Sequence, residues 1–350
     1  MESRQIEKKL KQTLDEVIDI VPIDENVVRE GCLATHSGYF HCDEALALAM
    51  LMLLPEFAKR PILRSRNQSL INQAHLVVDV GSVYDPNTLR FDHHQRGFNE
   101  TLNEKKKTKL SSAGLIYKHY GHRILKELLS DQTHLTEADF DVLFRACYDE
   151  FIEHLDGLDN GIDPYDGNKR YKVSTTLSLR VGYLNPSWND PDPYPAECFR
   201  DGMKLALTEF IACVERLTFE WLPARSLVEK AVTNRFEVHP SGSIIQLGGV
   251  GCPFRTHLSD LEDELGIPKI LYVICVDRIN AWNVICVNDR ESEFLSRKPL
   301  PEAWRGLRGM DLSEKAGLPE DVIFTHASGF IGGAVSHKTC LEMAVRSLEN

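Results

Sequence analysis

Four of the 13 histidines lie near aspartates in short polar segments, a pattern that can hold metal ions. The segments are residues 35–44, 78–81 and 91–95. Imidazoles and carboxylates without cysteine favour divalent Mn, Fe or Zn over Ca. A carboxylate such as Asp79 can bridge two ions, and a bridged pair suits hydrolysis of a phosphate ester. The candidate side chains in these segments are His36, His41, Asp43, Asp79, Asp92, His93 and His94.

Each segment follows or ends a stretch that is predicted to be a β-strand. Residues 31–36 are short and apolar, and a polar loop connects them to a helical run at 43–54. Residues 75–80 are rich in valine and end before the turn residue Gly81, and 89–92 predict another short strand. Loops beyond the carboxyl ends of the strands line the functional crevice of an open α/β sheet. We therefore expect the candidate side chains to converge.

Each candidate also has an ordinary structural explanation. His36 or His41 alone is more often a polar loop residue, and Asp43 alone is most simply the N-cap of the helix that follows. Asp79 alone can be part of ordinary turn chemistry, and residues 92–94 can form a solvated loop. Taken singly, these explanations are favoured by roughly two to one. Taken jointly, with every segment at a strand end, a common site is favoured.

An acidic helix that ends near Gly161 offers a fourth source of ligands. Asp149 and Glu153 share a helix face with Asp156, and for these two we expect a solvated acidic face. Asp156 and Asp159 lie at the carboxyl end of the helix, where negative charge opposes the helix dipole. A nearby cation would remove that cost. We therefore predict Asp156 as a ligand, with Asp159 as the alternative.

Composition excludes several classes of protein. The 350 residues suggest two domains at about 150 residues each. With 43% hydrophobic residues, the chain can bury a core. Its formal net charge of −12 excludes a protein that coats nucleic acid or anionic membranes by bulk charge. The longest apolar run, 45–54, is half of the roughly 20 residues that a bilayer span needs. Nine scattered cysteines without a CxxC motif indicate a reducing compartment.

We predict an α/β protein in four parts. Residues 1–25 form an N-terminal helical extension, and residues 26–189 form the metal-binding catalytic domain. Strands alternate with helices in this domain, so its sheet should be mainly parallel. Prolines mark the start of residues 190–235, which we assign to a linker and connecting helix. Residues 236–350 form a smaller α+β domain.

The C-terminal part holds two further candidate binding segments. Residues 326–333 follow a predicted strand and precede a helix, and such a glycine-rich loop can bring backbone N–H groups to a phosphate. The alternative is a tight turn. Residues 297–308 place basic side chains around Trp304, which suits a single-stranded nucleic acid, and a solvated loop is an even alternative. The basic residues of this second segment are Arg297, Lys298, Arg305 and Arg308.

The ordered set of motifs resembles one family. Residues 35–44, 91–95, 158–162 and 299–308 are similar to the Myg family of melanocyte-proliferating-gene proteins, also described as metal-dependent protein hydrolases, in the DHH phosphoesterase superfamily. The resemblance covers roughly residues 27–348. It implies an N-terminal DHH-type domain, a linker helix and a smaller C-terminal substrate domain.

The resemblance also implies a two-ion site, with Mn²⁺ favoured and Mg²⁺ as the alternative. Asp79 would bridge the ions, His94 would contact phosphate or assist proton transfer, and Asp92 would orient a ligand histidine. His41 stands where the superfamily usually has an aspartate, which leaves the metal preference open. The implied metal ligands are His36, His41, Asp43, Asp79, His93 and Asp156. The implied substrate-binding residues are His326, Gly332, Gly333, His337, Arg297 and Arg305.

The function implied by this resemblance is that of a metal-dependent phosphodiesterase, specifically a 3′–5′ RNA exonuclease that uses a two-metal-activated water. Its partner would be single-stranded RNA or an oligonucleotide, with no membrane. One alternative is a small-molecule phosphohydrolase acting on pyrophosphate or short oligonucleotides, which fits the charge of −12. Another is a non-catalytic metal- or nucleotide-binding regulator. Because the N-terminal residues are rich in acids and show no presequence, we expect nucleus and cytoplasm, with the mitochondrion suggested by the family.

Overall fold

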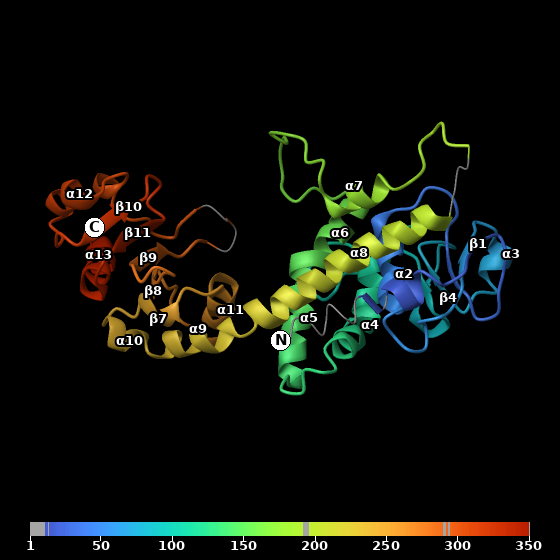
Figure 1. Ribbon diagram of the computed structural model, residues 1–350, viewed down its shortest axis with the longest axis horizontal. Helices are drawn as coiled ribbons and strands as arrows, with labels where there is room; N and C mark the ends of the chain where they lie inside the picture. The colour runs from blue at the N-terminus through green and yellow to red at the C-terminus, as the bar shows by residue number, and fades with distance from the viewer. Residues whose placement is uncertain (1–10, 13, 192–195, 290–291, 293–294, 350) are drawn as a thin grey trace. The chain divides into compact units, whose positions relative to one another are not determined.

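The computed structural model describes residues 11–12, 14–191, 196–289, 292 and 295–349 (Figure 1). The chain divides into two compact units, Met1–Phe219 and Glu220–Asn350, and each is described by itself. The boundary falls within residues 190–235, the stretch assigned to a linker and connecting helix. The finer four-part division stays a prediction.

A mixed six-stranded sheet forms the centre of the first unit. Its strand order is β1-β3-β2-β4-β6-β5, with parallel pairing throughout except between β5 and β6 at one edge. The expected α/β class is thus confirmed. The strands are β1 (Ile23–Glu25), β2 (Leu33–Thr35), β3 (Ile62–Arg64), β4 (Leu76–Val78), β5 (Tyr84–Asp85) and β6 (Arg90–Phe91).

Helix α2 (Cys42–Leu51) is the central helix of this unit, and all of its residues are buried. It packs against α4 (Ser112–Leu128) and α8 (Ala196–Arg216), as Figure 1 shows. The apolar run that begins at Ala45 therefore fills a protein core. No helix in the described ranges is long and apolar enough to cross a membrane.

The predicted acidic helix is a succession of three elements, α5 (Glu137–Cys147), the π-helical turn η3 (Tyr148–Ile152) and α6 (Glu153–Asp159). Of the predicted N-terminal helix, the π-helical turn η1 (Leu14–Ile18) is described, and residues 1–10 and 13 lie outside the described residues. Arg200 fixes the end of η1 by donating to the carbonyls of Ile18 and Val21. The other short elements of this unit are α3 (Gln68–Ile71), η2 (Pro86–Thr88) and α7 (Leu177–Gly182).

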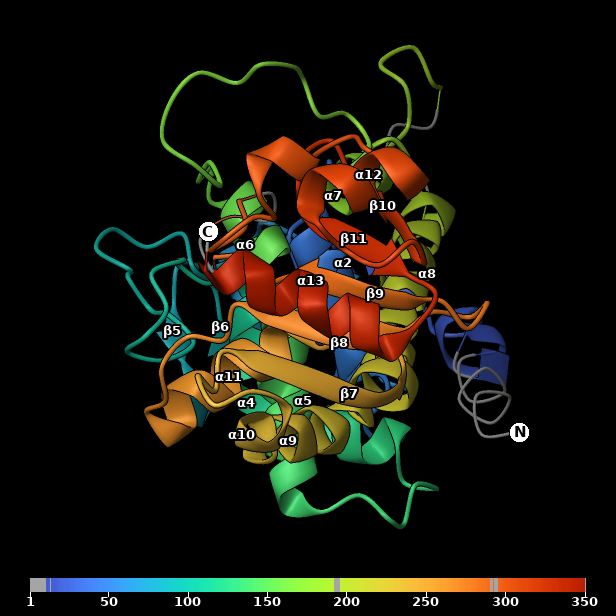
Figure 2. The same ribbon diagram turned by 90° about the vertical axis from the view of Figure 1, so that its left-hand side faces the viewer.

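The second unit holds a mixed five-stranded sheet in the order β10-β11-β9-β8-β7. Strands β8 and β9 form an antiparallel hairpin, and α13 packs against β9 and β11 (Figure 2). The strands are β7 (Ile244–Val250), β8 (Tyr272–Val276), β9 (Trp282–Cys286), β10 (Val322–Thr325) and β11 (Ile331–Ala334). The helices are α9 (Ala224–Thr233), α10 (Arg235–Val238), α11 (Arg255–Leu265), η5 (Glu302–Trp304), α12 (Gly309–Ala316) and α13 (His337–Glu349), and η4 (Leu217–Trp221) spans the unit boundary.

Two sequence-based expectations for this unit are wrong. Gly332 and Gly333 lie inside β11 and pair with both neighbouring strands, so they do not form a loop. A Cβ at Gly333 would lie 2.7 Å from the ring of Phe324, which explains the need for glycine by packing. Trp304 is buried in the core of the unit and presents no exposed stacking surface.

All nine cysteines lie in the described part of the chain as free thiols. Seven of them are buried, and Cys198 and Cys252 are half-buried.

Candidate metal centre

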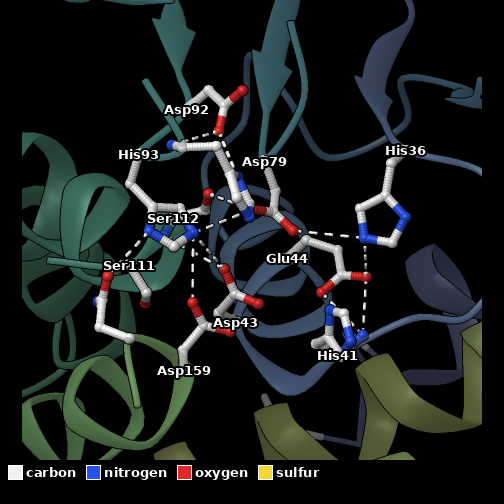
Figure 3. A network of polar contacts seen from close by, with 12 residues as sticks. His36, His41, Asp43, Glu44, Asp79, Asp92, His93, Ser111, Ser112 and Asp159 are labelled. Carbon is white, nitrogen blue, oxygen red and sulfur yellow. Dashed lines mark hydrogen bonds and ion pairs between the residues drawn. The ribbon is translucent and has the colours of Figure 1, made fainter. Parts of the chain in front are cut away.

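Asp79 lies at the centre of a buried group of imidazoles and carboxylates (Figure 3). It follows β4 directly and has a left-handed backbone, with φ of 58°, which aspartate adopts more readily than most residues. Its Oδ2 lies 3.4 Å from Nε2 of His36, and its Oδ1 lies 3.2 Å from Nε2 of His93. The two oxygens of one carboxylate therefore face two different histidines. Burial alone would raise the pKa of Asp79, but the nearby imidazoles of His36 and His93 hold it below its usual range.

The loop between β2 and α2 supplies one side of the group. Nε2 of His36 also lies 3.1 Å from Oε1 of Glu44. Burial lowers the pKa of His36, but hydrogen bonds to Asp79 and Glu44 raise it to about 10. His41 is the N-cap of α2, and its backbone N–H donates to both carboxylate oxygens of Glu44, at 2.9 and 3.0 Å. This is half of a capping box, and it fixes Glu44 between the two histidines.

His93 joins the other carboxylates of the group. Its Nε2 lies 3.2 Å from Oδ2 of Asp159 and 3.8 Å from Oδ2 of Asp43. Its Nδ1 lies 3.3 Å from Oδ1 of Asn160. Nδ1–H of His93 thus donates to the amide oxygen of Asn160, and the lone pair of Nε2 faces the carboxylates. Metal-binding histidines are usually held in this way.

Two buried polar atoms of this group, among the described residues, indicate whether the group suits a cation. Nε2 of His93 and Oδ1 of Asp43 have no hydrogen-bond partner of good geometry. Burial, together with repulsion from Asp79 and Asp159, raises the pKa of Asp43 well above its ordinary value. Such crowding of carboxylates is costly without a positive charge between them. The residues therefore fit divalent cations.

Possible ligand atoms in the described part of the chain form three overlapping groups, and within each group they lie within 4.8 Å of one another. Histidine nitrogen and carboxylate oxygen are the donors that Mn, Fe and Zn accept. The groups are His36, His41, Glu44 and Asp79; then Asp79, His93 and His94; and then His41, Asp43 and Asp159. Asp79 and His41 each belong to two groups.

Asp92 orients His94. Its Oδ1 accepts both the backbone N–H of His94 at 3.1 Å and Nδ1–H of the same ring at 2.8 Å. Burial alone would raise the pKa of Asp92, but hydrogen bonds from His94 and Ser82 lower it. The His94 side chain is 59% exposed, and its Nδ1 lies 3.5 Å from Oδ1 of Asp79. His94 is therefore an accessible imidazole held beside the buried group.

The structure places Asp159, and not Asp156, in this group. Asp156 is fully buried, and its Oδ1 accepts the backbone N–H and the hydroxyl of Ser111 at 2.9 and 2.7 Å. Its Oδ2 accepts the hydroxyl of Tyr148 at 3.1 Å. Burial raises the pKa of Asp156 to about 7. Asp156 thus anchors the start of α4, while Asp159, the last residue of α6, reaches His93.

The start of α4 also faces the site. Ser112 donates its backbone N–H to Oδ2 of Asp43 at 3.2 Å and its hydroxyl to Oδ1 of Asp79 at 3.2 Å. Neither Ser112 nor Glu44 was predicted from the sequence as a site residue. The signal for Glu44 was present, because it stands three residues after the N-cap of α2.

Comparison with known proteins identifies the family of this chain. A family model named MYG1_exonuc, described as Uncharacterised protein family (UPF0160), matches residues 32–348. The chain belongs to this family. The expected resemblance to the Myg family is thereby confirmed.

Three members of the MYG1 family illustrate the similarity. The Homo sapiens protein named MYG1 exonuclease is 45% identical over 323 residues, which cover 90% of this chain and 85% of the relative. The Mus musculus protein of the same name is 44% identical over 331 residues, covering 92% and 86%. The Dictyostelium discoideum MYG1 protein is 44% identical over 321 residues, covering 90% and 96%.

The substrate-binding residues that were predicted for the C-terminal part of this MYG1 family member lie in the second unit. Arg297 is buried and donates to both carboxylate oxygens of Glu262, at 2.6 and 3.0 Å, so it contributes to the unit's own packing. Arg305 donates to the carbonyl of Leu300. His337 lies at the start of α13, 2.7 Å from Gln246, and His326 contacts Ser328.

Proposed function

We propose that this MYG1 family member is a metal-dependent phosphodiesterase of the DHH superfamily that degrades single-stranded RNA from its 3′ end. The placement of Asp79 between His36 and His93, with one carboxylate oxygen toward each, carries the proposal. A carboxylate in this position suits the bridge of a two-ion site. RNA as substrate and the 3′–5′ direction rest on the resemblance to the family.

The described residues include candidate metal ligands, and we propose that they hold two Mn²⁺ ions. Bound ions of this kind lower the pKa of water and neutralise phosphoryl oxygens. Because Asp43 and Asp159 bring two carboxylates to the side of His93, that side can balance a divalent charge. The proposed ligands are His36, His41, Asp43, Asp79, His93 and Asp159, with Glu44 beside them.

Other side chains would position groups and move protons. His94 is exposed and keeps its Nδ1 hydrogen on Asp92, so its other ring nitrogen is available to hold or give up a proton at a substrate oxygen. Ser112 holds the orientation of Asp79 by donating its hydroxyl. Asn160 keeps the ring of His93 turned with Nε2 toward the carboxylates.

The names of the relatives favour a nuclease over the alternatives. The human and mouse relatives are both named exonuclease, and each aligns with most of this chain. A formal charge of −12 argues for a short single strand bound locally and against broad coating of a duplex. A pyrophosphate hydrolase and a non-catalytic regulator remain as outcomes of the test below.

The test uses the full chain with Mn²⁺ and single-stranded RNA labelled at its 5′ end. The proposal predicts a ladder of products that shorten stepwise, whereas RNA labelled at its 3′ end should release labelled mononucleotide at once. Asp79→Asn should abolish turnover. Asparagine also tolerates the left-handed backbone at this position, so the substitution removes charge with little strain.

Asp141→Asn is the matched control because Asp141 is an exposed aspartate of α5. It should retain wild-type turnover. With pyrophosphate as a second substrate, its hydrolysis without any shortening of RNA would replace the nuclease by the small-molecule enzyme. Bound Mn²⁺ without turnover of either substrate would indicate the regulator. Full activity of Asp79→Asn would contradict the assignment of the site.

A further inference from the structure

A cavity of about 430 Å³ adjoins the metal centre. Its lining includes His36, Asp79 and His94 of the centre together with Arg66, Gln68 and Ile71. Its volume lies at the lower end of the range of roughly 300–1,000 Å³ that small-ligand sites occupy. The cavity therefore suits one small group and is too small for a length of duplex.

Among the described residues that line the cavity, Arg66 is the one guanidinium. It lies between β3 and α3, and the hydrogen bonds of its two neighbours fix its backbone. Ser65 donates to Asn26 at 2.6 Å, and Asn67 caps α3 by accepting the backbone N–H of Ser69 at 3.0 Å. The side chain itself is exposed. A planar fork of N–H donors at this place matches the oxygens of a phosphate.

The present contacts of Arg66 involve a ligand histidine. Its Nε donates to the carbonyl of Ser37 at 3.0 Å, and its Nη2 lies 3.0 Å from Nδ1 of His36. The same Nδ1 lies 3.1 Å from the carbonyl of Ser37. An Nδ1 that carries hydrogen donates to Ser37, and only an Nδ1 without hydrogen can accept from Arg66.

If His36 held a cation through Nε2, one of these two contacts of its Nδ1 would be lost. A neutral imidazole that gives its Nε2 lone pair to a cation keeps its one hydrogen on Nδ1. Nη2 of Arg66 then has no acceptor on His36. The guanidinium has its remaining N–H groups available for an anion in the adjoining cavity.

We propose that this cavity receives the terminal nucleotide of the substrate as a nucleoside 5′-monophosphate group and that Arg66 binds its phosphate. The inference rests on the proposed function and deepens it, because a pocket for one nucleotide accounts for the mononucleotide release that the proposed function predicts. Ile71 and Val80 give the lining of the cavity an apolar part for the nucleoside. Arg66 is thus a binding residue for the phosphate that links the terminal nucleotide to the strand.

The experiment measures ligand binding to the full chain loaded with Mn²⁺ by titration calorimetry. The probes are adenosine 5′-monophosphate, adenosine and inorganic phosphate. Wild-type protein should bind the monophosphate more tightly than either part alone. Arg66→Ala should weaken that binding about tenfold or more, as expected for loss of a charge-assisted hydrogen bond. The affinity of Arg66→Lys for the monophosphate should lie between those of the wild type and Arg66→Ala, since lysine keeps the positive charge but lacks the planar set of N–H donors.

A second readout separates this role from a structural one. The Mn²⁺ affinity of Arg66→Ala should equal or exceed that of wild type, because a positive charge and a competitor for His36 have been removed. Arg123→Ala is the control, since Arg123 is an exposed arginine paired with Glu56. It should change neither affinity.

The proposal would be overturned if Arg66→Ala bound the monophosphate as tightly as the wild-type protein does. It would also be overturned if Arg66→Ala lost affinity for Mn²⁺. Equal binding of inorganic phosphate and the monophosphate would exclude the nucleoside part. Failure of the proposed function is distinct, because a wild-type protein that shortens no RNA can still be titrated with these probes.

Discussion

The side-chain amide of Asn185 is hydrogen bonded to both backbone groups of Phe40. Its Oδ1 accepts the N–H of Phe40 at 2.9 Å, and its Nδ2 donates to the carbonyl at 2.8 Å. Next to it, the hydroxyl of Tyr39 donates to the carbonyl of Pro186 at 3.1 Å. Phe40 directly precedes His41, the N-cap of α2. The segment after α7 therefore fixes the backbone that presents His41 to the metal centre.

Asn185→Ala should therefore affect both stability and metal binding. Loss of the two bonds should lower the free energy of unfolding by about 1–3 kcal/mol, because the backbone groups of Phe40 lose their partner. The Mn²⁺ affinity should fall with it. Urea unfolding and a Mn²⁺ titration measure the two effects. Asn189→Ala, at an exposed position of the same segment, should leave both unchanged, and equal behaviour of the two variants would refute the positioning role.

The substitution Glu44→Gln should distinguish the role of Glu44 in capping α2 from the role of its negative charge at the metal centre. Glutamine retains an oxygen that can accept the N–H of His41, so the free energy of unfolding should change little. The lost negative charge faces His36 and the proposed ions, so the Mn²⁺ affinity should fall about 10- to 100-fold. Glu104→Gln, at an exposed site, serves as the comparison. Unchanged affinity in Glu44→Gln would remove Glu44 from the centre.

Gly114→Ala should destabilise the protein although alanine favours helices. Gly114 lies in the first turn of α4, where a Cβ would collide with the carboxylate of Asp156. Overpacking of this kind costs about 1–3 kcal/mol, which exceeds the gain of about 1 kcal/mol in helix propensity. Gly182→Ala in α7 has open space and should be nearly neutral. Denaturant midpoints decide between them, and a stabilised Gly114→Ala variant would contradict the contact.

The raised pKa of Asp156 should make the stability of the metal-free protein depend on pH. Its pKa is about 7 in the folded state against an ordinary 3.8, because burial favours the protonated form. The folded state therefore holds this proton more tightly than the unfolded state does. The free energy of unfolding should fall as pH rises from about 4 to about 7, by an amount on the order of 4 kcal/mol.

Asp156→Asn should remove this contribution while keeping an oxygen for Ser111. The difference in unfolding free energy between the variant and wild type should grow as pH rises through that window. A difference that stays constant from pH 4 to pH 8 would show that Asp156 titrates normally.

Local patterns were sufficient to predict the elements that carry the site. Apolar runs predicted β2, β4 and α2 to within a few residues, because buried strands and a buried helix need continuous apolar sequence. The parallel sheet then brings the segments around His36, Asp79 and His93 to one edge. That convergence was predicted, and Figure 3 shows these three side chains directed toward one another.

What could not be predicted depends on contacts between distant residues. Asp156 and Asp159 lie on the same short helix, and only the position of α4 directs one to Ser111 and leaves the other for His93. Asn185 acts on a residue 145 positions away, which no local pattern reveals. The Gly332-Gly333 pair predicts a loop by composition, yet side chains packed closely against it require glycine within a strand.

The most direct test of the metal centre counts bound ions. The full chain is titrated with Mn²⁺, and the free ion is measured by electron paramagnetic resonance, for wild type, Asp79→Asn and the control Asp141→Asn. The proposed bridge predicts two tightly bound ions per chain in wild type and the control, and loss of this tight binding in Asp79→Asn. Wild-type protein that binds no Mn²⁺ tightly, or an Asp79→Asn variant that binds it as wild type does, would contradict a metal centre organised around Asp79.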